Sequence, residues 1–156
     1  MPRIKTKRTK AAPEGFDKIQ PTLADFDLRL KEVHSEQGSK LAAKANEGTW
    51  KILQLTHERS RYIFDLFYKR KAISKELYEW LLREKYADKM LIAKWKKRGY
   101  EKLCCLRCIQ SSESSSEGHT CICRVPRSVL EKNSKDGVVT FTRCTHCGCS
   151  GCASSD

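Results

Sequence analysis

Apolar residues recur every three or four positions over much of the first hundred residues, which is the spacing of amphipathic helices. The first stripe comprises Leu23, Phe26, Leu30 and Val33. Because Thr22 and Asp25 form a capping pair, we expect this helix to begin at Thr22. Helical spacing resumes over residues 39–70, which predicts a second helix with Gly48 as a weak point.

Two further helices are predicted after the second. Ser74 is a favourable N-cap residue for the third helix, and Asp88 opens a short fourth helix that Gly99 would end. The fold class is therefore mainly α. We expect a basic arm and irregular lead-in at residues 1–21, followed by a helical domain of about four helices at residues 22–99.

The C-terminal third contains all the cysteines and few large apolar residues. Metal ligands are expected at Cys104, Cys105, Cys108, Cys121, Cys123, Cys144, Cys147, Cys149 and Cys152. The spacing C-x2-C occurs three times, and such a turn directs two thiolates at one tetrahedral zinc ion. Gly148 and Gly151 lie between ligands, where tight turns require positive φ. An odd number of cysteines cannot all pair as disulfides within the chain.

Residues 100–156 are predicted to form a small, irregular α+β zinc-cluster module. Alternating patterns at residues 121–123 and 138–142 predict short strands that bring distant ligands together. A segment of this size with so little apolar content needs a metal to fold. The module should therefore be stabilised by zinc rather than by a hydrophobic core.

The number of zinc ions follows from counting bonds. Three tetrahedral ions need twelve bonds, and nine thiolates supply them if six are terminal and three bridge two ions each. Eight cysteines could instead hold two separate ions and leave Cys104 idle. We favour three ions because every cysteine is used, and His119 and His146 are then not ligands, although imidazole also suits zinc.

The net charge of +12 predicts attraction to a polyanion such as nucleic acid. Residues 1–100 hold 24 basic and 13 acidic residues, a net of +11, so this partner belongs to the N-terminal part. The basic arm could contact phosphates or serve as a nuclear-import signal. Candidate RNA contacts are Arg3, Lys5, Lys7, Arg8, Lys10, Lys96, Lys97 and Arg98.

Several classes of protein are not expected. No apolar run approaches the roughly 18 residues of a membrane span, and the first residues lack a secretory signal, so an intracellular protein without membrane contact is predicted. A zinc ion surrounded by sulfur has no open position for a substrate or water. We therefore expect no enzyme activity, no small-molecule substrate and no homo-oligomer.

Six strings of residues resemble one known family, the small bud-site-selection splicing factors, also called the G-ten family. They are MPRIKT at 1–6, YKRKAIS at 68–74, EKYADK at 84–89, GYEKLCCLRC at 99–108, CICRVPR at 121–127 and HCGC at 146–149. The resemblance covers essentially the whole chain. It implies a nuclear protein of the activated spliceosome, near the catalytic small nuclear RNA and large core splicing proteins, with a three-zinc cluster on the nine cysteines.

Two other classes share parts of the pattern. A ubiquitin-ligase cross-brace uses eight ligands in two sites and usually includes histidine, but its spacing differs from this one. A chromatin- or transcription-associated nuclear adaptor is the second alternative. Nine cysteines with three zinc ions also precede histone-methyltransferase catalytic domains, and we expect 156 residues to leave no room for such a domain.

Overall fold

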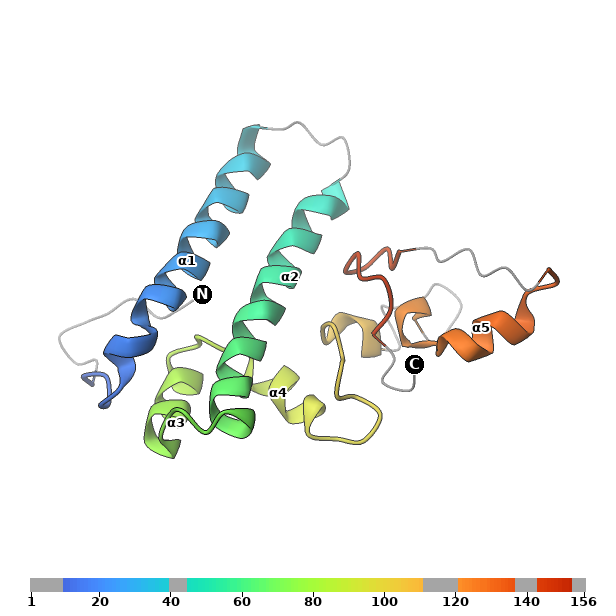
Figure 1. Ribbon diagram of the computed structural model, residues 1–156. Helices are drawn as coiled ribbons and strands as arrows, with labels where there is room; N and C mark the ends of the chain where they lie inside the picture. Colours follow the sequence, from blue (N-terminus) through green and yellow to red (C-terminus); the bar gives the residue numbers. More distant parts are fainter. Residues whose placement is uncertain (1–9, 40–44, 111–120, 137–142, 153–156) are drawn as a thin grey trace. The chain divides into compact units, whose positions relative to one another are not determined.

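The computed structural model forms two compact units (Figure 1). The residues that the structure describes are 10–39, 45–110, 121–136 and 143–152. The first unit consists of Met1–Leu41 and Leu55–Ile92, and the second consists of Ala42–Gln54 and Ala93–Asp156. Helix α2 therefore contributes its beginning to the second unit and its end to the first. The fold is mainly helical, as predicted.

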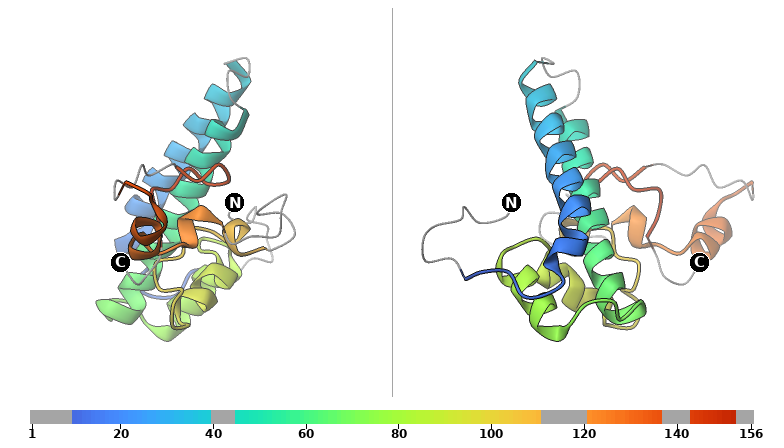
Figure 2. Two further views of the ribbon diagram at one scale, coloured as in Figure 1. Left: turned by 90° about the vertical axis from the view of Figure 1, so that its right-hand side faces the viewer. Right: turned by 60° about the vertical axis from the view of Figure 1, so that its left-hand side comes forward.

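The first unit is built around α1 (Phe16–Ser39), the later part of α2 (Ala45–Phe64), and α3 (Lys75–Arg83). Helix α1 and the part of α2 after Gln54 run antiparallel and side by side in all views (Figures 1 and 2). The core side chains include Phe16, Ile19, Leu23, Phe26, Leu30, Leu55, Ile63, Leu66, Leu77, Trp80, Leu81 and Leu91. Of the predicted stripe of the first helix, Leu23, Phe26 and Leu30 are buried and Val33 is half-buried.

Helix α1 begins earlier than the capping pair predicts. It starts at Phe16, so Thr22 lies inside the helix and the expected start there is wrong. The apolar stripe extends backwards through Phe16 and Ile19, whose side chains are buried. The Phe16 ring also meets Trp80 edge-on at a centroid distance of 5.1 Å. This packing outweighs the main-chain hydrogen bond that Pro21, inside the helix, cannot donate.

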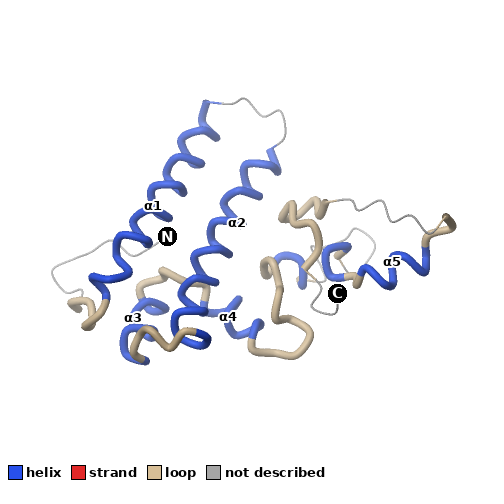
Figure 3. The backbone as a smooth tube through the Cα atoms, viewed as in Figure 1, coloured by secondary structure: helices blue, strands red, loops and turns tan. Residues whose placement is uncertain are grey.

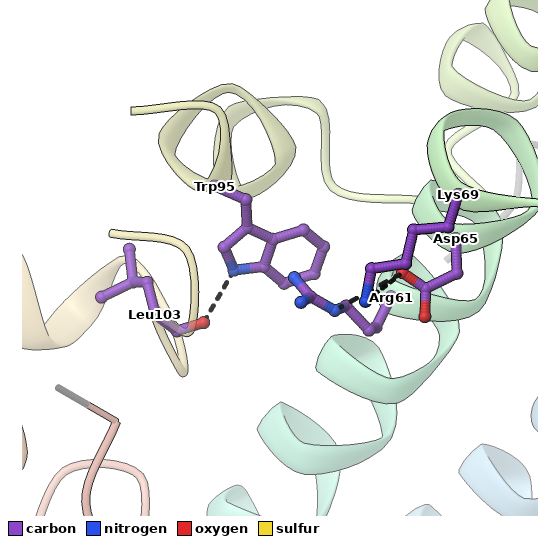
Figure 4. A network of polar contacts seen from close by, with 5 residues as sticks. All are labelled: Arg61, Asp65, Lys69, Trp95 and Leu103. Carbon is purple, nitrogen blue, oxygen red and sulfur yellow. Dashed lines mark hydrogen bonds and ion pairs between the residues drawn. The ribbon is translucent and has the colours of Figure 1, made fainter. Parts of the chain in front are cut away.

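The second predicted helix is shorter than its pattern suggests. Helix α2 begins at Ala45, so Gly48 lies in its first turn. A glycine there does not interrupt the run of hydrogen bonds along the helix. The α-helix ends at Phe64 and continues as a π-helical turn, η1 (Asp65–Lys69). The Asp65 carboxylate there pairs with Arg61 at 3.7 Å and with Lys69 at 3.6 Å (Figure 4).

Among the described residues of the first unit, two polar residues are buried, Arg59 and Ser60. Arg59, whose side chain is 3% exposed, donates a hydrogen bond to Asp27 at 2.9 Å. Burial lowers the pKa of the Arg59 guanidinium, and the nearby Asp27 carboxylate opposes that shift. The Ser60 hydroxyl accepts a hydrogen bond from the main-chain N–H of Asp88 at 3.0 Å. These contacts tie α2 to α1 and to the residue before α4.

The two predicted caps of the later helices are confirmed. The Ser74 hydroxyl accepts a hydrogen bond from the N–H of Leu77 at 3.2 Å, at the start of α3. The Asp88 carboxylate accepts hydrogen bonds from Met90 at 3.0 Å and Leu91 at 3.2 Å. Helix α4 (Lys89–Trp95) follows directly, and Gly99 comes after its end with φ of +87°.

The second unit holds short helical turns: η2 (Arg107–Ile109), η3 (Ile122–Arg124) and α5 (Arg127–Asn133). Within the described residues no strand is present (Figure 3). The strand expected at residues 121–123 is therefore wrong, and the one expected at 138–142 lies outside the described residues. In a strand, the Cα atoms of residues two positions apart are separated by about 6.6 Å. Only a bent chain brings the Cys121 and Cys123 sulfur atoms to 3.5 Å.

Candidate metal centre

The first cysteine segment is anchored by a buried tryptophan in the second unit. The Trp95 indole N–H, at the end of α4, donates to the Leu103 carbonyl at 2.9 Å (Figure 4). Leu103 itself is fully buried. The chain then passes through Cys104 and Cys105 into turn η2, which brings the sulfur atoms of Cys105 and Cys108 to 3.6 Å.

The last four cysteines lie on a segment that turns at residues 145–147 and bends at Ser150. The Gly148 N–H donates to the Cys144 carbonyl at 2.8 Å, and the Cys144 N–H donates to the Cys149 carbonyl at 3.1 Å. Gly148 has φ of +70° and Gly151 has φ of +120°. Both angles are unfavourable for side chains with a Cβ atom, so the predicted role of these glycines is confirmed. The Cys152 N–H also donates to the Cys123 carbonyl at 2.9 Å, which joins this segment to η3.

None of the nine cysteines forms a disulfide bond, and their sulfur atoms gather in one cluster. Neighbouring Sγ atoms lie 3.3 Å apart at Cys121 and Cys144, and 3.9 Å apart at Cys104 and Cys105. These separations exceed the roughly 2.05 Å of a disulfide bond. They match the edge of a tetrahedron of sulfur around zinc, about 3.8 Å for a Zn–S bond near 2.3 Å. The donor set therefore fits zinc.

The sulfur atoms fall into overlapping groups of four that could each hold one metal ion. Within each group the ligand atoms lie within 4.8 Å of one another. The groups are Cys104, Cys108, Cys123 and Cys147; Cys104, Cys123, Cys149 and Cys152; and Cys108, Cys121, Cys123 and Cys144. Cys105 belongs to none of them, although its sulfur lies between Cys104 and Cys108.

The electrostatics of the cluster call for a cation. The hydrogen bond to Cys105 raises the pKa of the Cys104 thiol, and the same bond lowers the pKa of Cys105. Burial raises the pKa of the Cys144 thiol to about 11, whereas the hydrogen bond from Cys104 lowers the pKa of Cys152 to about 6. Nine thiolates this close would repel one another, so full deprotonation needs bound metal ions.

Arg124 approaches the cluster from outside. Its guanidinium donates to the Cys152 carbonyl at 2.8 Å and to the Cys152 sulfur at 3.6 Å. It also donates to the Gly99 carbonyl and lies over the Tyr100 ring at 5.1 Å. The sequence interpretation missed this residue, although its position directly after Cys123 was a usable signal. A cation here offsets part of the negative charge of the thiolates.

Helix α2 supplies two further neighbours that the sequence interpretation missed. Leu53 packs against the cysteine cluster, and the Trp50 indole N–H donates to the Thr145 carbonyl at 2.9 Å. The helical spacing of this segment placed it with the helical domain. No local signal distinguishes a tryptophan that packs on a metal module from one in a helical core.

The remaining predicted residues fall outside the cluster. His146 is in none of the groups of four, and its Nδ1 lies 4.0 Å from the Cys144 sulfur; His119 lies outside the described residues. Among the candidate RNA contacts, Arg3, Lys5, Lys7 and Arg8 also lie outside the described residues. Those that the structure places on the surface are Lys10, Lys96, Lys97 and Arg98.

Comparison with known proteins covers the whole chain. The model of the family described as "Pre-mRNA-splicing factor BUD31" matches residues 1–154. This chain belongs to the BUD31 family. It is 63% identical over 158 residues to pre-mRNA-splicing factor BUD31 of Saccharomyces cerevisiae, with both chains covered completely. Identity to pre-mRNA-splicing factor cwf14 of Schizosaccharomyces pombe is 57% over 156 residues, again covering both chains completely.

A vertebrate relative extends the similarity within the BUD31 family. The BUD31 homolog of Danio rerio is 51% identical over 153 residues, covering 98% of this chain and 99% of its own. These matches confirm the resemblance to the bud-site-selection splicing factors. In the described part of the chain, no helix has both the length and the apolar content that a membrane crossing requires.

Proposed function

We propose that this chain is a non-catalytic structural component of the spliceosome that acts in pre-mRNA splicing in the nucleus. The observation that carries this proposal is the 63% identity, over the full length of both chains, to a protein named as a pre-mRNA-splicing factor. Its partners would be spliceosomal small nuclear RNA and large core splicing proteins. Cross-linking with mass spectrometry on purified activated spliceosomes tests this: cross-links to those components support it, and absence of the chain from them contradicts it.

The nine cysteines would hold three zinc ions as a structural cluster. The three overlapping groups of four sulfur atoms and the tetrahedral sulfur spacing support this count. The second unit has little apolar core, so zinc would supply the cross-links that hold it together. No coordination position would remain open for catalysis. Native mass spectrometry of the intact protein tests the count. Two bound ions would return the alternative in which Cys104 is idle.

The absence of turnover follows from the same ligand set. A nucleophilic cysteine would need a free thiolate and a nearby base, and here every thiol lies in the cluster. The proposal is refuted by a reaction that the purified protein catalyses and that one substitution abolishes without unfolding the chain. Loss of zinc and loss of activity in the same variant would not meet that condition.

The basic residues would contact RNA phosphates rather than base edges. The net charge of +11 over residues 1–100 and the exposure of Lys96, Lys97 and Arg98 support this role. Phosphate contacts release counterions, so each one adds roughly −0.7 to the log–log slope of affinity against salt for single strands. Sequence preference should be slight, because phosphates are the same in every RNA.

A matched pair of variants tests the RNA contacts. Alanine at Lys96, Lys97 and Arg98 should weaken binding uniformly across RNA sequences and flatten the salt slope. The control places alanine at three other exposed cations, Lys18, Lys31 and Arg83. Equal losses in the two variants would show that only net charge matters and would contradict specific contacts.

The basic arm needs a test of its own because it could serve nuclear import. The variant carries alanine at Arg3, Lys5, Lys7, Arg8 and Lys10. If the arm binds RNA, this variant has a flatter salt slope than the unchanged protein. If it enters the nucleus poorly but keeps its RNA affinity, the arm is an import signal, and the proposed RNA contact of the arm is wrong.

A further inference from the structure

We propose that residues 68–75 of the first unit bind single-stranded RNA. In this site the Tyr68 ring stacks on a base, and Arg70 and Lys71 contact the adjoining phosphates. The inference rests on the proposed RNA contact of this chain and adds a site that the candidate contacts above do not include. We call it the Tyr68 surface, formed by residues 68–75 and the aromatic rings packed against Tyr68.

The Tyr68 surface carries positive charge that no carboxylate offsets. Residues 68–75 contain four basic residues and no acidic one. Two of the four pair with carboxylates four positions away along the chain, at 3.6 and 3.9 Å (Figure 4 shows the first pair). In the described part of the chain, Arg70 and Lys71 form no ion pair, and both side chains are exposed. Two adjacent cations are therefore available to an anionic ligand.

The main chain fixes these cations at the end of η1. Two hydrogen bonds of 2.8 Å close this end, from the Arg70 N–H to the Asp65 carbonyl and from the Ala72 N–H to the Leu66 carbonyl. Lys71, between them, has φ of +49°, a left-handed conformation that glycine adopts at lower free energy. The helix dipole favours cations here, but the two preceding cations already supply that contribution. A lysine in this strained position therefore points to a role for its side chain.

The Tyr68 ring is exposed and also held in place. Its exposed fraction is 38%. Its centroid lies 4.8 Å from the Phe64 ring, 4.8 Å from the Phe67 ring and 5.7 Å from the buried Tyr78 ring. The Phe67 and Tyr78 rings stack on each other at 4.3 Å and form the base of this cluster. Because the Tyr68 ring is already ordered, stacking on a ligand costs little further conformational entropy.

The combination of ring and charge favours a nucleic acid over a protein partner. An acidic peptide would pair with Arg70 and Lys71 but would place no flat ring against Tyr68. A single strand of RNA offers a base and a phosphate in every nucleotide, and base stacking on an aromatic ring tolerates any sequence. A duplex keeps its bases stacked inside the helix. The ligand that fits both parts of the surface is therefore an unpaired strand.

Two variants of Tyr68 test the stacking contact in the full-length, zinc-loaded protein. The probes are a labelled short strand of adenosines and an abasic strand with the same number of phosphates, followed by fluorescence anisotropy. Tyr68→Leu should weaken binding to the adenosine strand about fivefold or more, with an unchanged salt slope and unchanged binding to the abasic strand. Tyr68→Phe, which keeps the ring, should bind like the unchanged protein. Normal binding by Tyr68→Leu overturns the stacking contact.

A matched pair of double variants tests the phosphate contacts. Arg70→Gln with Lys71→Gln should weaken binding to both strands and reduce the log–log salt slope by about 1.4, since each contact contributes roughly 0.7. Lys18→Gln with Lys31→Gln is the control, because it removes the same charge from two other exposed positions of the first unit. The control should change the slope little. Equal changes in the two double variants contradict contacts at Arg70 and Lys71.

Photocross-linking of the unchanged protein decides the question even if a variant does not fold. A uracil that carries iodine at position 5 forms a bond, under near-ultraviolet light and with loss of hydrogen iodide, to an aromatic ring that stacks on it. We expect mass spectrometry to locate this cross-link at Tyr68. RNA binding with cross-links only elsewhere overturns the Tyr68 surface and leaves the proposed RNA contact intact.

Two further outcomes would also count against the inference. A full-length protein that binds neither strand overturns the proposed RNA contact itself, and the Tyr68 surface with it. If the variants bind RNA normally and the surface cross-links to a protein in purified spliceosomes, the occupant is a protein segment and the RNA site is wrong.

Discussion

The indole N–H of Trp50 donates a hydrogen bond to the main-chain carbonyl of Thr145, 95 positions later in the chain, at 2.9 Å. The same indole ring occupies the space beside Gly148. A Cβ atom at Gly148 would lie 2.6 Å from two ring carbons of Trp50. The beginning of α2 and the last cysteine segment are thus packed too closely for any side chain at this glycine.

Gly148→Ala should destabilise the second unit strongly. The left-handed backbone alone costs about 1–2 kcal/mol for a residue with a Cβ atom, and overpacking typically adds about 1–3 kcal/mol. Gly99→Ala is the matched control, because Gly99 has φ of +87° but a Cβ atom added there would meet nothing within 4 Å. Thermal unfolding of the zinc-loaded proteins measures both. Equal destabilisation would show that the contact with Trp50 contributes nothing.

Arg124→Gln should speed zinc loss to a chelator. The substitution removes a charge-assisted hydrogen bond to Cys152 and a cation beside an anionic cluster, which together are worth about 1.5–3 kcal/mol. If this loss of free energy appears entirely in the step that releases zinc, release becomes roughly tenfold faster or more. Arg127→Gln is the control, since Arg127 is exposed and pairs with Glu131 at 3.2 Å. An Arg124 variant that releases zinc as slowly as this control contradicts the role.

Asp27→Ala should unfold the first unit more easily. The substitution leaves the Arg59 guanidinium, only 3% exposed, without its carboxylate partner. Removing one partner of a buried pair costs about 3–5 kcal/mol, and the 32% exposure of Asp27 places the expected loss near the lower end. Glu79→Ala breaks the exposed pair with Lys75 and should cost about 0–1 kcal/mol. Denaturant unfolding of the two variants measures how much each ion pair contributes to the free energy of unfolding.

Metal removal should unfold the second unit before the first. Zinc binds thiolates, so lowering the pH protonates the ligands and weakens binding; stability from the metal is present at neutral pH and lost as the pH falls. A strong chelator at neutral pH should have the same effect. Far-UV circular dichroism should keep most of its helical signal, because the core of α1, α3 and the end of α2 contains no cysteine. Loss of all helix in a single step would contradict this prediction.

Several features were predictable from the sequence because they depend on neighbours in the chain. The apolar stripe of α1, the Ser74 cap of α3 and the Asp88 cap of α4 involve residues within one or two helical turns. Positive φ at Gly148 and Gly151 also follows from local spacing between ligands. The clustering of the nine cysteines agrees with the prediction of one metal-binding set, which was made because thiolates at C-x2-C spacing have few other uses in a chain with an odd number of them.

Other features depended on contacts between distant segments, and only the tertiary structure decided them. Helix α1 starts at Phe16 because that ring packs on Trp80, 64 positions away, and Cys121 to Cys123 bends because its two thiols converge on sulfur atoms from other segments. Trp50 and Arg124 contact the segments of the cysteine cluster for the same reason. Apolar periodicity and capping residues reflect interactions among a few neighbouring residues. Which faces meet, and which thiols lie close enough to share an ion, depends on packing across the whole unit.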